Sequence, residues 1–187
     1  MIIRTQKELK SILLYEYRRY FPHNRSALQI VKQRFEHNLT DRIWTWQKWL
    51  RMCEYLEGKN GLVNHIRMHI ARRNLNKLGE KLNIEIYPGN FEKGLLIWHT
   101  GIVVNNHARI GINCELHGNN CIGNRGGGAT EGVPILGNNV DIGYGAVVIG
   151  AVHLADNIKV GANAVVNHTC DIVNTVLVGV PAKKLNE

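Results

Sequence analysis

Features that would place a chain across a membrane or around a metal are missing from this sequence. It has no apolar run of the about 18 or more residues that usually span a bilayer, and charges interrupt residues 1–21 too often for a signal peptide. We therefore expect a cytoplasmic protein. The four cysteines, Cys53, Cys114, Cys121 and Cys170, show no CxxC spacing, which argues against a zinc site or a redox motif. They are expected to be small buried thiols.

Positive charge is concentrated in one part of the chain. Residues 1–85 contain 17 Lys and Arg against 8 Asp and Glu, whereas residues 86–187 contain 6 against 7. Composition changes at the same place, which predicts an α-helical N-terminal region over 1–83 and a second domain over 84–187. A basic helical region is compatible with binding to nucleic acid, with binding to an anionic membrane surface, or with simple exposure to solvent. Because the charges alternate with apolar residues, we favour a solvated face, place membrane-surface proximity second, and expect no nucleic-acid partner.

Apolar residues at spacings of three and four predict three helices in the first region. They cover residues 6–21, 41–56 and 62–82, with Pro22 and the following HNRS as the turn between the first two. Asp41 is the expected N-cap of the second helix.

The second region repeats every six residues, and this is the strongest signal in the sequence. Ten hexapeptides begin with Ile, Leu or Val, at Val104, Ile110, Leu116, Ile122, Leu136, Ile142, Val148, Leu154, Val160 and Val166. The second position is usually Gly, Asn or Ala, and the fifth is usually small or β-branched. The period predicts a coil with flat sides, in which the first residue points inward and stacks on its counterpart in the next coil. Gly and Asn suit the left-handed backbone of the corners.

This pattern, over about residues 84–185, resembles the left-handed parallel β-helix of the bacterial hexapeptide acyltransferases. The segments IEIYPGN, HTGIVV, NNHARIGINC, ELHGNNCIGN, NNVDIGYGAVVIG, DNIKVGANAVV and VGVPAKKL look more narrowly like the serine acetyltransferase branch. The helical preamble and short length are similar to relatives of that branch that acetylate sugars of capsule, exopolysaccharide and lipopolysaccharide. The resemblance implies a mainly β fold, a left-handed parallel β-helix preceded by an α-helical region, with three hexapeptides in each triangular coil.

The resemblance assigns catalysis to His99, in the HTGIVV segment. The family has its general base there, which takes the proton of an acceptor hydroxyl as the oxygen attacks the acetyl-CoA thioester. An imidazole suits this role because it accepts and returns a proton near neutral pH. Glu85, in the IEIYP segment, takes the place of the acid that orients the base. This chain departs from the family in having Glu for Asp and one residue fewer before His99. The alternatives are a structural corner histidine and an exposed acid.

Two further positions bear on the acceptor. His117 follows His99 by 18 residues, so it is expected on the same edge one coil away, about 5 Å along the stack. There it would bind the acceptor or the acetyl carbonyl, or be a solvated corner residue. Trp98 stands where the family has an acid, and residues 132–134 read Gly-Val-Pro where serine acetyltransferases have an Arg-His-Pro that grips the serine carboxylate. Both differences favour a carbohydrate hydroxyl as acceptor, with serine O-acetyltransferase of cysteine biosynthesis as the alternative; Trp98 equally suits packing in a trimer core.

For acetyl-CoA the chain has neither a P-loop nor GxGxxG before a helix, and the resemblance requires neither, because the pantetheine arm lies in a groove between two β-helices. The matching positions are Asn124, Gly143, Tyr144 and Ala162, with Lys159 and Lys183 as candidates for the cofactor's phosphates. Backbone N–H groups of Thr100 and Gly101, or of Gly118, are candidates to stabilise the oxyanion. The groove implies a homotrimer, with a hexamer left open.

A third hypothesis is an inactive hexapeptide scaffold, or a relative of the γ-type carbonic anhydrases on the same fold. Zinc in that family needs three histidines, two of them close along one coil. His117 is followed five residues on by Ile122 and not by a histidine, so we expect no metal.

Overall fold

The computed structural model describes residues 3–23, 25–36, 38–126 and 132–185. The chain divides into two compact units, Met1–Leu82 and Asn83–Glu187, and each is described by itself. The predicted boundary lies one residue away, between residues 83 and 84. None of the helices in the described part of the chain has the length and apolar character needed to cross a bilayer.

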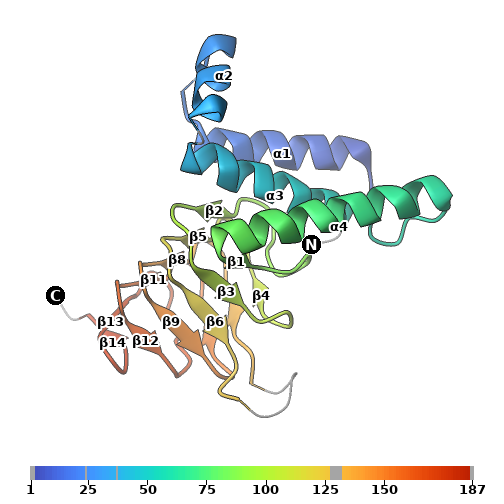
Figure 1. The fold of residues 1–187 in the computed structure, drawn as a ribbon. Helices are drawn as coiled ribbons and strands as arrows, with labels where there is room; N and C mark the ends of the chain where they lie inside the picture. The colour runs from blue at the N-terminus through green and yellow to red at the C-terminus, as the bar shows by residue number, and fades with distance from the viewer. Residues whose placement is uncertain (1–2, 24, 37, 127–131, 186–187) are drawn as a thin grey trace. The chain divides into compact units, whose positions relative to one another are not determined.

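The first unit is helical, with α1 (Gln6–Tyr20), α2 (Ala27–Phe35), α3 (Leu39–Leu56) and α4 (Leu62–Leu82) (Figure 1). α3 packs against both α1 and α4. α1 begins at a capping box, in which the Thr5 hydroxyl accepts a hydrogen bond from the Glu8 N–H at 3.1 Å and Glu8 Oε2 accepts one from the Thr5 N–H at 3.3 Å. The predicted helices over 6–21, 41–56 and 62–82 correspond to α1, α3 and α4.

Two details of the helical prediction are wrong. α2 was not predicted: it follows the turn predicted at residues 22–26 and begins where Ser26 and Gln29 form a second capping box through bonds of 2.8 and 3.2 Å. The N-cap of α3 is Asn38, whose side chain accepts from the Asp41 N–H at 3.4 Å. Asp41 is instead a buried partner of Arg25, at 3.0 Å.

A charged triad is buried in the helical unit. Arg51 of α3 lies 2.7 Å from Glu16 of α1 and 2.8 Å from Glu54, and all three side chains are at most 1% exposed. Burial acts to lower the pKa of Arg51, but the two carboxylates outweigh it and raise that pKa further above its ordinary value. The guanidinium therefore stays charged and ties α1 to α3.

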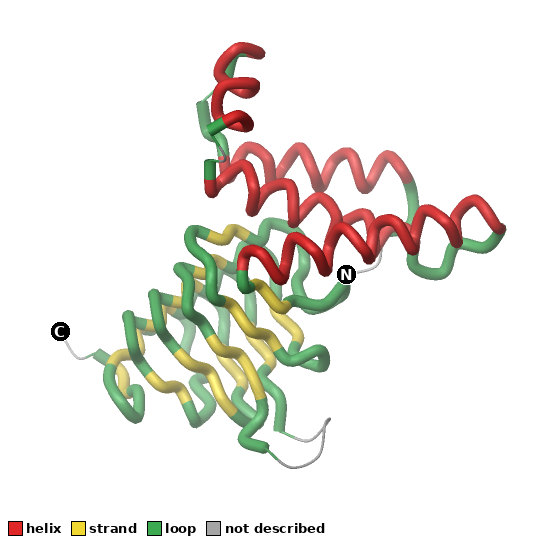
Figure 2. Tube along the Cα trace, in the orientation of Figure 1, coloured by secondary structure: helices red, strands yellow, loops and turns green. Residues whose placement is uncertain are grey.

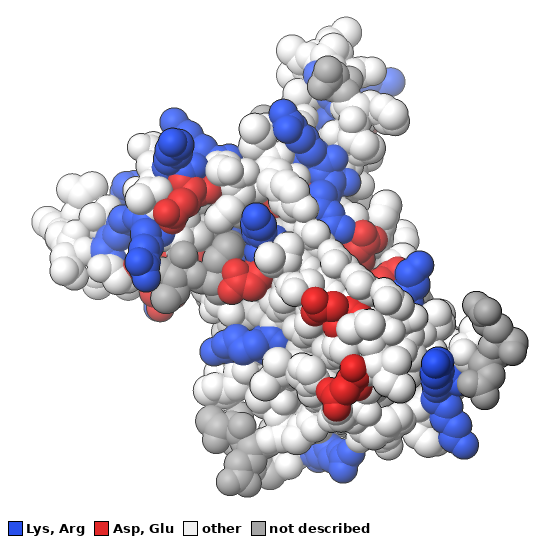
Figure 3. All heavy atoms as spheres, turned by 180° about the vertical axis from the view of Figure 1, so that it is seen from behind, with Lys and Arg blue, Asp and Glu red and all other residues white. Residues whose placement is uncertain are grey.

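The charge of the helical unit is spread over its surface. On the face drawn in Figure 3, Lys and Arg side chains lie at several separate places over the helices and form no single block. On α4, for example, Arg67, Arg72, Arg73, Lys77 and Lys81 are all exposed.

The second unit is a coil with three parallel sheets as its sides (Figure 2). One sheet contains β1 (Ile84–Glu85), β3 (Ile102–Val104), β6 (Cys121–Gly123), β9 (Val147–Ile149) and β12 (Val165–Val166). The smallest contains β4 (Arg109–Ile110), β7 (Ile135–Leu136) and β10 (His153–Leu154). The third contains β2 (Leu96–Ile97), β5 (Glu115–Leu116), β8 (Asp141–Ile142), β11 (Lys159–Val160), β13 (Val176–Val178) and β14 (Lys183–Lys184). Only β13 and β14 pair antiparallel among the described strand pairs.

The core of the coil confirms how the hexapeptides were interpreted. All ten first-position side chains, from Val104 to Val166, are between 0% and 3% exposed. Fifth-position residues such as Ala108, Ala146 and Ala164 are fully buried. Corner asparagines, including Asn119 and Asn163, have positive φ values, as expected for left-handed corners. All four cysteines are free thiols, but only Cys53 and Cys114 are buried, so the expectation of buried thiols was wrong for Cys121 and Cys170.

Candidate active site

Six of the predicted site residues lie at one kind of corner, where the chain leaves the six-stranded sheet and enters the five-stranded one. They are Trp98, His99, His117, Gly143, Tyr144 and Ala162. In successive coils this corner is formed by residues 98–101, 117–119, 143–145 and 161–163. The corners are stacked by backbone hydrogen bonds, such as that from the Asn119 N–H to the Thr100 carbonyl at 2.9 Å. Residues with the same place in successive corners therefore form columns along one edge of the coil.

Two such columns carry the predicted residues. The first contains Trp98, His117, Gly143 and Gly161, and the second contains Thr100, Gly118, Tyr144 and Ala162. His99 lies between the two columns and contacts the second at Gly118 and Tyr144. Trp98 and His117 each donate a backbone hydrogen bond of 3.0 Å to the strand of the next coil. The register thus brings Gly143, Tyr144 and Ala162, which were predicted to hold the cofactor, to the same edge as His99.

His117 lies on the predicted edge one coil away from His99, but it stacks on Trp98 and not on His99 itself. Leu96 pairs with Glu115 and Val103 with Cys121, so the corner that contains His99 has one residue more than the corner above it. This extra residue shifts the stacking. His117 lies beside Trp98, with ring centroids 6.1 Å apart, and the residue next to His99 is Gly118.

His99 has an exposed imidazole at the bend after β2. Its ring packs edge-on against the ring of Tyr144, at a centroid distance of 6.3 Å and an interplanar angle of 78°. The Tyr144 hydroxyl accepts a hydrogen bond from the Asn119 side chain at 2.5 Å. In the described part of the chain, no hydrogen bond or ion pair is made by the His99 ring. The ring is therefore held by packing and is open to a ligand.

The predicted pairing of Glu85 with His99 is not found among the described residues. Glu85 lies on β1 of the five-stranded sheet, where its Oε1 accepts a hydrogen bond of 2.7 Å from the Tyr87 hydroxyl. This bond to the carboxylate raises the pKa of the Tyr87 hydroxyl. Glu85 pairs in register with Val103, beyond the corner that contains His99. Glu85 therefore lies on a side of the coil and His99 at a corner, which the spacing of the motif could not reveal.

Two carboxylates that sequence reasoning missed contact the first column. The Trp98 indole N–H donates to Glu115 Oε2 at 3.2 Å. His117 Nε2 lies 2.8 Å from Asp141 Oδ1, although the direction falls outside hydrogen-bond geometry and Nε2 is shielded from solvent. Glu115 and Asp141 face each other in register on β5 and β8. Both directly precede a first-position aliphatic residue, and this shared hexapeptide position is the signal that would have found them.

The remaining cofactor candidates lie elsewhere on the coil. Lys159 on β11 and Lys183 on β14 are exposed and belong to the six-stranded sheet. Lys159 pairs in register with Asp141. Asn124 follows β6, at the end of the five-stranded sheet away from His99. The structure therefore does not bring Asn124 to the edge that carries Tyr144 and Ala162.

The loop between β6 and β7 contains the Gly-Val-Pro segment that stands where the resemblance implies Arg-His-Pro. Residues 127–131 lie outside the described residues; Gly132 and Val133 are partly buried and Pro134 is buried. Arg125 donates a hydrogen bond to the carbonyl of Asn167. The guanidinium of Arg125 is thus bound to the backbone that follows β12.

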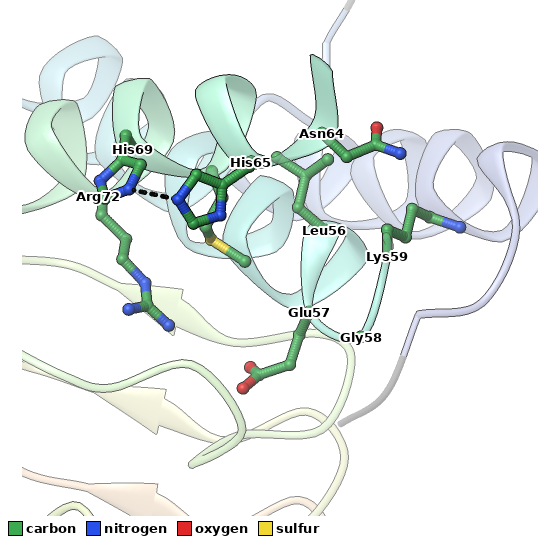
Figure 4. A pocket seen from close by; sticks show the side chains of 9 residues that line it. Leu56, Glu57, Gly58, Lys59, Asn64, His65, His69 and Arg72 are labelled. Atoms are coloured by element: carbon green, nitrogen blue, oxygen red, sulfur yellow. Dashed lines mark hydrogen bonds between the residues drawn. The ribbon is translucent and has the colours of Figure 1, made fainter. Parts of the chain in front are cut away.

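The helical unit has a pocket of its own, drawn in Figure 4. It is about 280 Å³ in volume and is lined by α4 and the turn before it. His65 and His69 lie there with their Nε2 atoms 3.1 Å apart. None of the residues predicted to bind acceptor or cofactor lines this pocket.

Comparison with known proteins gives a clear result only at the level of structure. No family model and no curated protein matches the sequence. The serine acetyltransferase of Neisseria gonorrhoeae superposes with a TM-score of 0.71 at 21% identity, over 97% of this chain and 68% of that one. A soybean serine acetyltransferase complexed with serine gives 0.69 at 22%, over 95% and 69%. A serine acetyltransferase in complex with CoA gives 0.67 at 21%, over 96% and 71%.

The chain has the fold of the serine acetyltransferases. The predicted fold class, a left-handed parallel β-helix preceded by an α-helical region, is confirmed. At this level of identity the likeness defines the fold, and the chemistry must be argued from the residues at the corner. In the described part of the chain, no three His, Cys, Asp or Glu side chains are placed to hold a metal ion.

Proposed function

We propose that this protein transfers an acetyl group from acetyl-CoA to a hydroxyl of a small acceptor. The observation that carries the proposal is the exposed imidazole of His99, on a stacked edge of a fold whose solved neighbours include a complex with CoA. Gly118 and Tyr144 border the ring on the side of the next coil. The edge continues past Ala162, and we propose that the pantetheine arm lies along it, with Lys159 and Lys183 near the phosphates.

The proposed chemistry uses His99 as the general base. Its imidazole takes the proton of the acceptor hydroxyl while the oxygen attacks the thioester carbonyl carbon. The tetrahedral intermediate then collapses, the C–S bond breaks, and the proton passes to the sulfur of CoA. The N–H groups of Thr100 and Gly101 donate no hydrogen bond among the described residues, so they are candidates for the oxyanion. The Gly118 N–H is already bound to Asn120 Oδ1, at 2.9 Å.

Serine is the acceptor that the comparisons favour. The neighbours are serine acetyltransferases, and one of them contains serine. The match also extends through the helical unit, since it covers 95% to 97% of this chain. On this ground serine is the first acceptor to test.

A sugar hydroxyl is the second candidate, and residues of this chain favour it. Trp98 is 49% exposed beside His99, and the flat apolar face of an indole suits the C–H groups of a sugar ring. Residues 132–134 read Gly-Val-Pro, so this segment supplies no cation for a serine carboxylate.

A thiol-release assay tests the proposal. The protein is incubated with acetyl-CoA and either L-serine, glucose or N-acetylglucosamine, and free CoA is followed over time. We expect acceptor-dependent release, and at least about a hundredfold loss in His99→Ala, since a general base contributes on the order of a hundredfold or more. His168→Ala, which removes another exposed histidine of the coil, is the matched control. Full activity of His99→Ala would exclude His99 as the base.

We also propose that the chain acts as a homotrimer, with the cofactor groove between neighbouring β-helices. Exposed apolar side chains on the coil support such packing, including Val103 at 44%, Ile135 at 52% and Ile172 at 60%. Sedimentation equilibrium should then give about three times the chain mass of 21.1 kDa. A mass equal to one chain would exclude the shared groove. The cytoplasmic location and the proximity of the basic helical unit to a membrane surface stay predictions.

A further inference from the structure

We propose that α4 carries a binding site for a monovalent copper ion, with the Nε2 atoms of His65 and His69 and the sulfur of Met68 as its ligands. The three residues line the pocket drawn in Figure 4. They stand at positions i, i+3 and i+4 of one helix, so their side chains project from the same face. The inference is independent of the proposed acetyl transfer, because it uses none of the residues assigned to acceptor or cofactor.

The two imidazoles are already close enough to hold one ion. His65 Nε2 and His69 Nε2 are 3.1 Å apart, and the two rings stand edge to face at an interplanar angle of 78°. An ion about 2.0–2.1 Å from both nitrogens, which is the usual distance from zinc to imidazole, would see them about 100° apart. That is an ordinary angle between neighbouring ligands. Two histidines four residues apart on one helix face are also the spacing of a known class of metal site.

Each ring can offer an unprotonated Nε2 to an ion. In the contact between two neutral rings, one Nε2 carries a hydrogen and donates it to the other. Both side chains are exposed, so that hydrogen can be exchanged through water for one on Nδ1 of the same ring. The ion then takes the place of the shared hydrogen, and both Nε2 atoms become ligands.

Met68 decides which kind of ion fits. Its side chain is half-buried and lines the pocket with the two histidines. Within the described ranges of the chain, no third His, Cys, Asp or Glu is placed to complete a metal site with the pair, and Figure 4 shows the Glu57 carboxylate pointing away from the rings. The thioether is the soft donor that remains. Soft sulfur ligands favour Cu(I), whereas carboxylates and carbonyls suit harder ions.

The charges around the pocket also favour a monovalent ion. Lys59 and Arg72 line it together with a single carboxylate, that of Glu57. The repulsion between these cations and a bound ion is proportional to the charge of the ion, so it is about twice as large for Zn(II) or Cu(II) as for Cu(I). Two imidazoles and a thioether are neutral, and they bring no negative charge to offset that difference.

Competition for Cu(I) tests the site in the full chain. The protein is titrated with Cu(I) in ascorbate against bicinchoninate, whose copper complex is coloured. Because thiols also bind Cu(I), the parent protein for all titrations carries Cys121→Ser and Cys170→Ser, which remove the two cysteines that are not buried. Burial raises the pKa of the Cys53 thiol in α3 to about 11, so this thiol stays protonated and does not compete.

Loss of either imidazole should abolish the clamp. We expect the parent protein to take a single Cu(I) ion from the probe. His65→Ala and His69→Ala should each weaken binding by about a hundredfold or more, since even a group that only orients a ligand contributes about 10- to 100-fold. Far-ultraviolet circular dichroism checks that both variants keep α4, as expected for exposed positions and a strong helix former.

Met68→Leu separates a copper site from a histidine pair that binds any metal. It keeps a side chain of similar volume and removes the sulfur, so the affinity for Cu(I) should fall about tenfold or more. The affinity for Zn(II), measured with a zinc-sensitive dye, should stay unchanged. Met52→Leu is the matched control, because Met52 is a half-buried methionine of α3 that does not line the pocket. It should leave both affinities unchanged.

X-ray absorption of the bound copper identifies its ligands directly. The parent protein should show nitrogen and sulfur neighbours, and Met68→Leu should show nitrogen without sulfur. Unchanged affinity for Cu(I) in both His65→Ala and His69→Ala would overturn the inference. Equal affinities for Cu(I) in the parent and in Met68→Leu would overturn it too, because copper would then bind without the thioether.

Discussion

Gly118 lies so close to His99 that a β-carbon added to the glycine would come within 2.7 Å of the His99 β-carbon. The same atom would lie 3.2 Å from Cε2 of Tyr144. The glycine therefore maintains the gap in which the imidazole stands against the tyrosine ring. It also has a φ of +112°, which side chains of L-residues rarely adopt.

Gly118→Ala should displace the His99 ring and lower kcat on the order of a hundredfold, since a shift of about 1 Å in a catalytic group can have that effect. The matched control is Gly126→Ala. Gly126 also has a positive φ, of +92°, but no atom of the described residues lies within 4 Å of its added β-carbon. Acetyl transfer and melting temperature are measured for both variants. Equal losses of activity in both would show that backbone strain, and not the displaced ring, is responsible.

Glu85→Gln tests whether the acid assigned by resemblance acts on His99. Because Glu85 accepts from the Tyr87 hydroxyl at 2.7 Å, we expect kcat to stay within about threefold. The pKa of the Tyr87 hydroxyl, which the carboxylate raises, should fall toward its ordinary value. Ultraviolet titration against Tyr87→Phe as the blank measures that change. A fall in kcat of a hundredfold, with the Tyr87 titration unmoved, would restore the catalytic pairing.

Asp156→Asn tests a bond between neighbouring coils. Asp156 accepts from the Asn138 N–H at 2.6 Å and from its side-chain amide at 3.2 Å, and the backbone bond first of all lowers the pKa of Asp156 from 3.8. A lowered pKa stabilises the fold above the unfolded value, and the contribution is lost as the pH falls through the folded one. The variant should therefore melt at a lower temperature at pH near neutral. The gap to wild type should close below about pH 3.8; a gap independent of pH would contradict the assignment.

Arg51→Ala should destabilise the helical unit strongly. It would leave Glu16 and Glu54 buried together without their cation, and breaking a buried pair in this way costs about 3–5 kcal/mol of unfolding free energy. Urea unfolding followed by far-ultraviolet circular dichroism measures the loss. Lys32→Ala is the control, because the Lys32–Glu36 pair is exposed at 71% and 55% and should contribute less than about 1 kcal/mol. Similar losses in the two variants would mean that the triad has no special role.

The six-residue repeat was enough to predict most of the fold of the second unit. An aliphatic residue must stack on its counterpart to leave water, so the ten first-position residues predicted the core of the coil without any knowledge of its coordinates. Corner asparagines were predictable for a similar reason, because few other residues accept a positive φ. The helix α2 was missed because Leu28, Val31 and Phe35 are exposed, so no buried face marks it.

The arrangement of side chains at the corner was decided by the tertiary structure. The sequence determined that His99 stands at a corner, because local periodicity fixes where each strand ends. It did not determine which residue of the next coil meets His99, since one extra residue between β2 and β3 makes the pairing before this corner differ by one residue from the pairing after it. The bonds of Glu85 to Tyr87 and of Trp98 to Glu115 likewise depend on distances between coils, which a spacing along the chain does not contain.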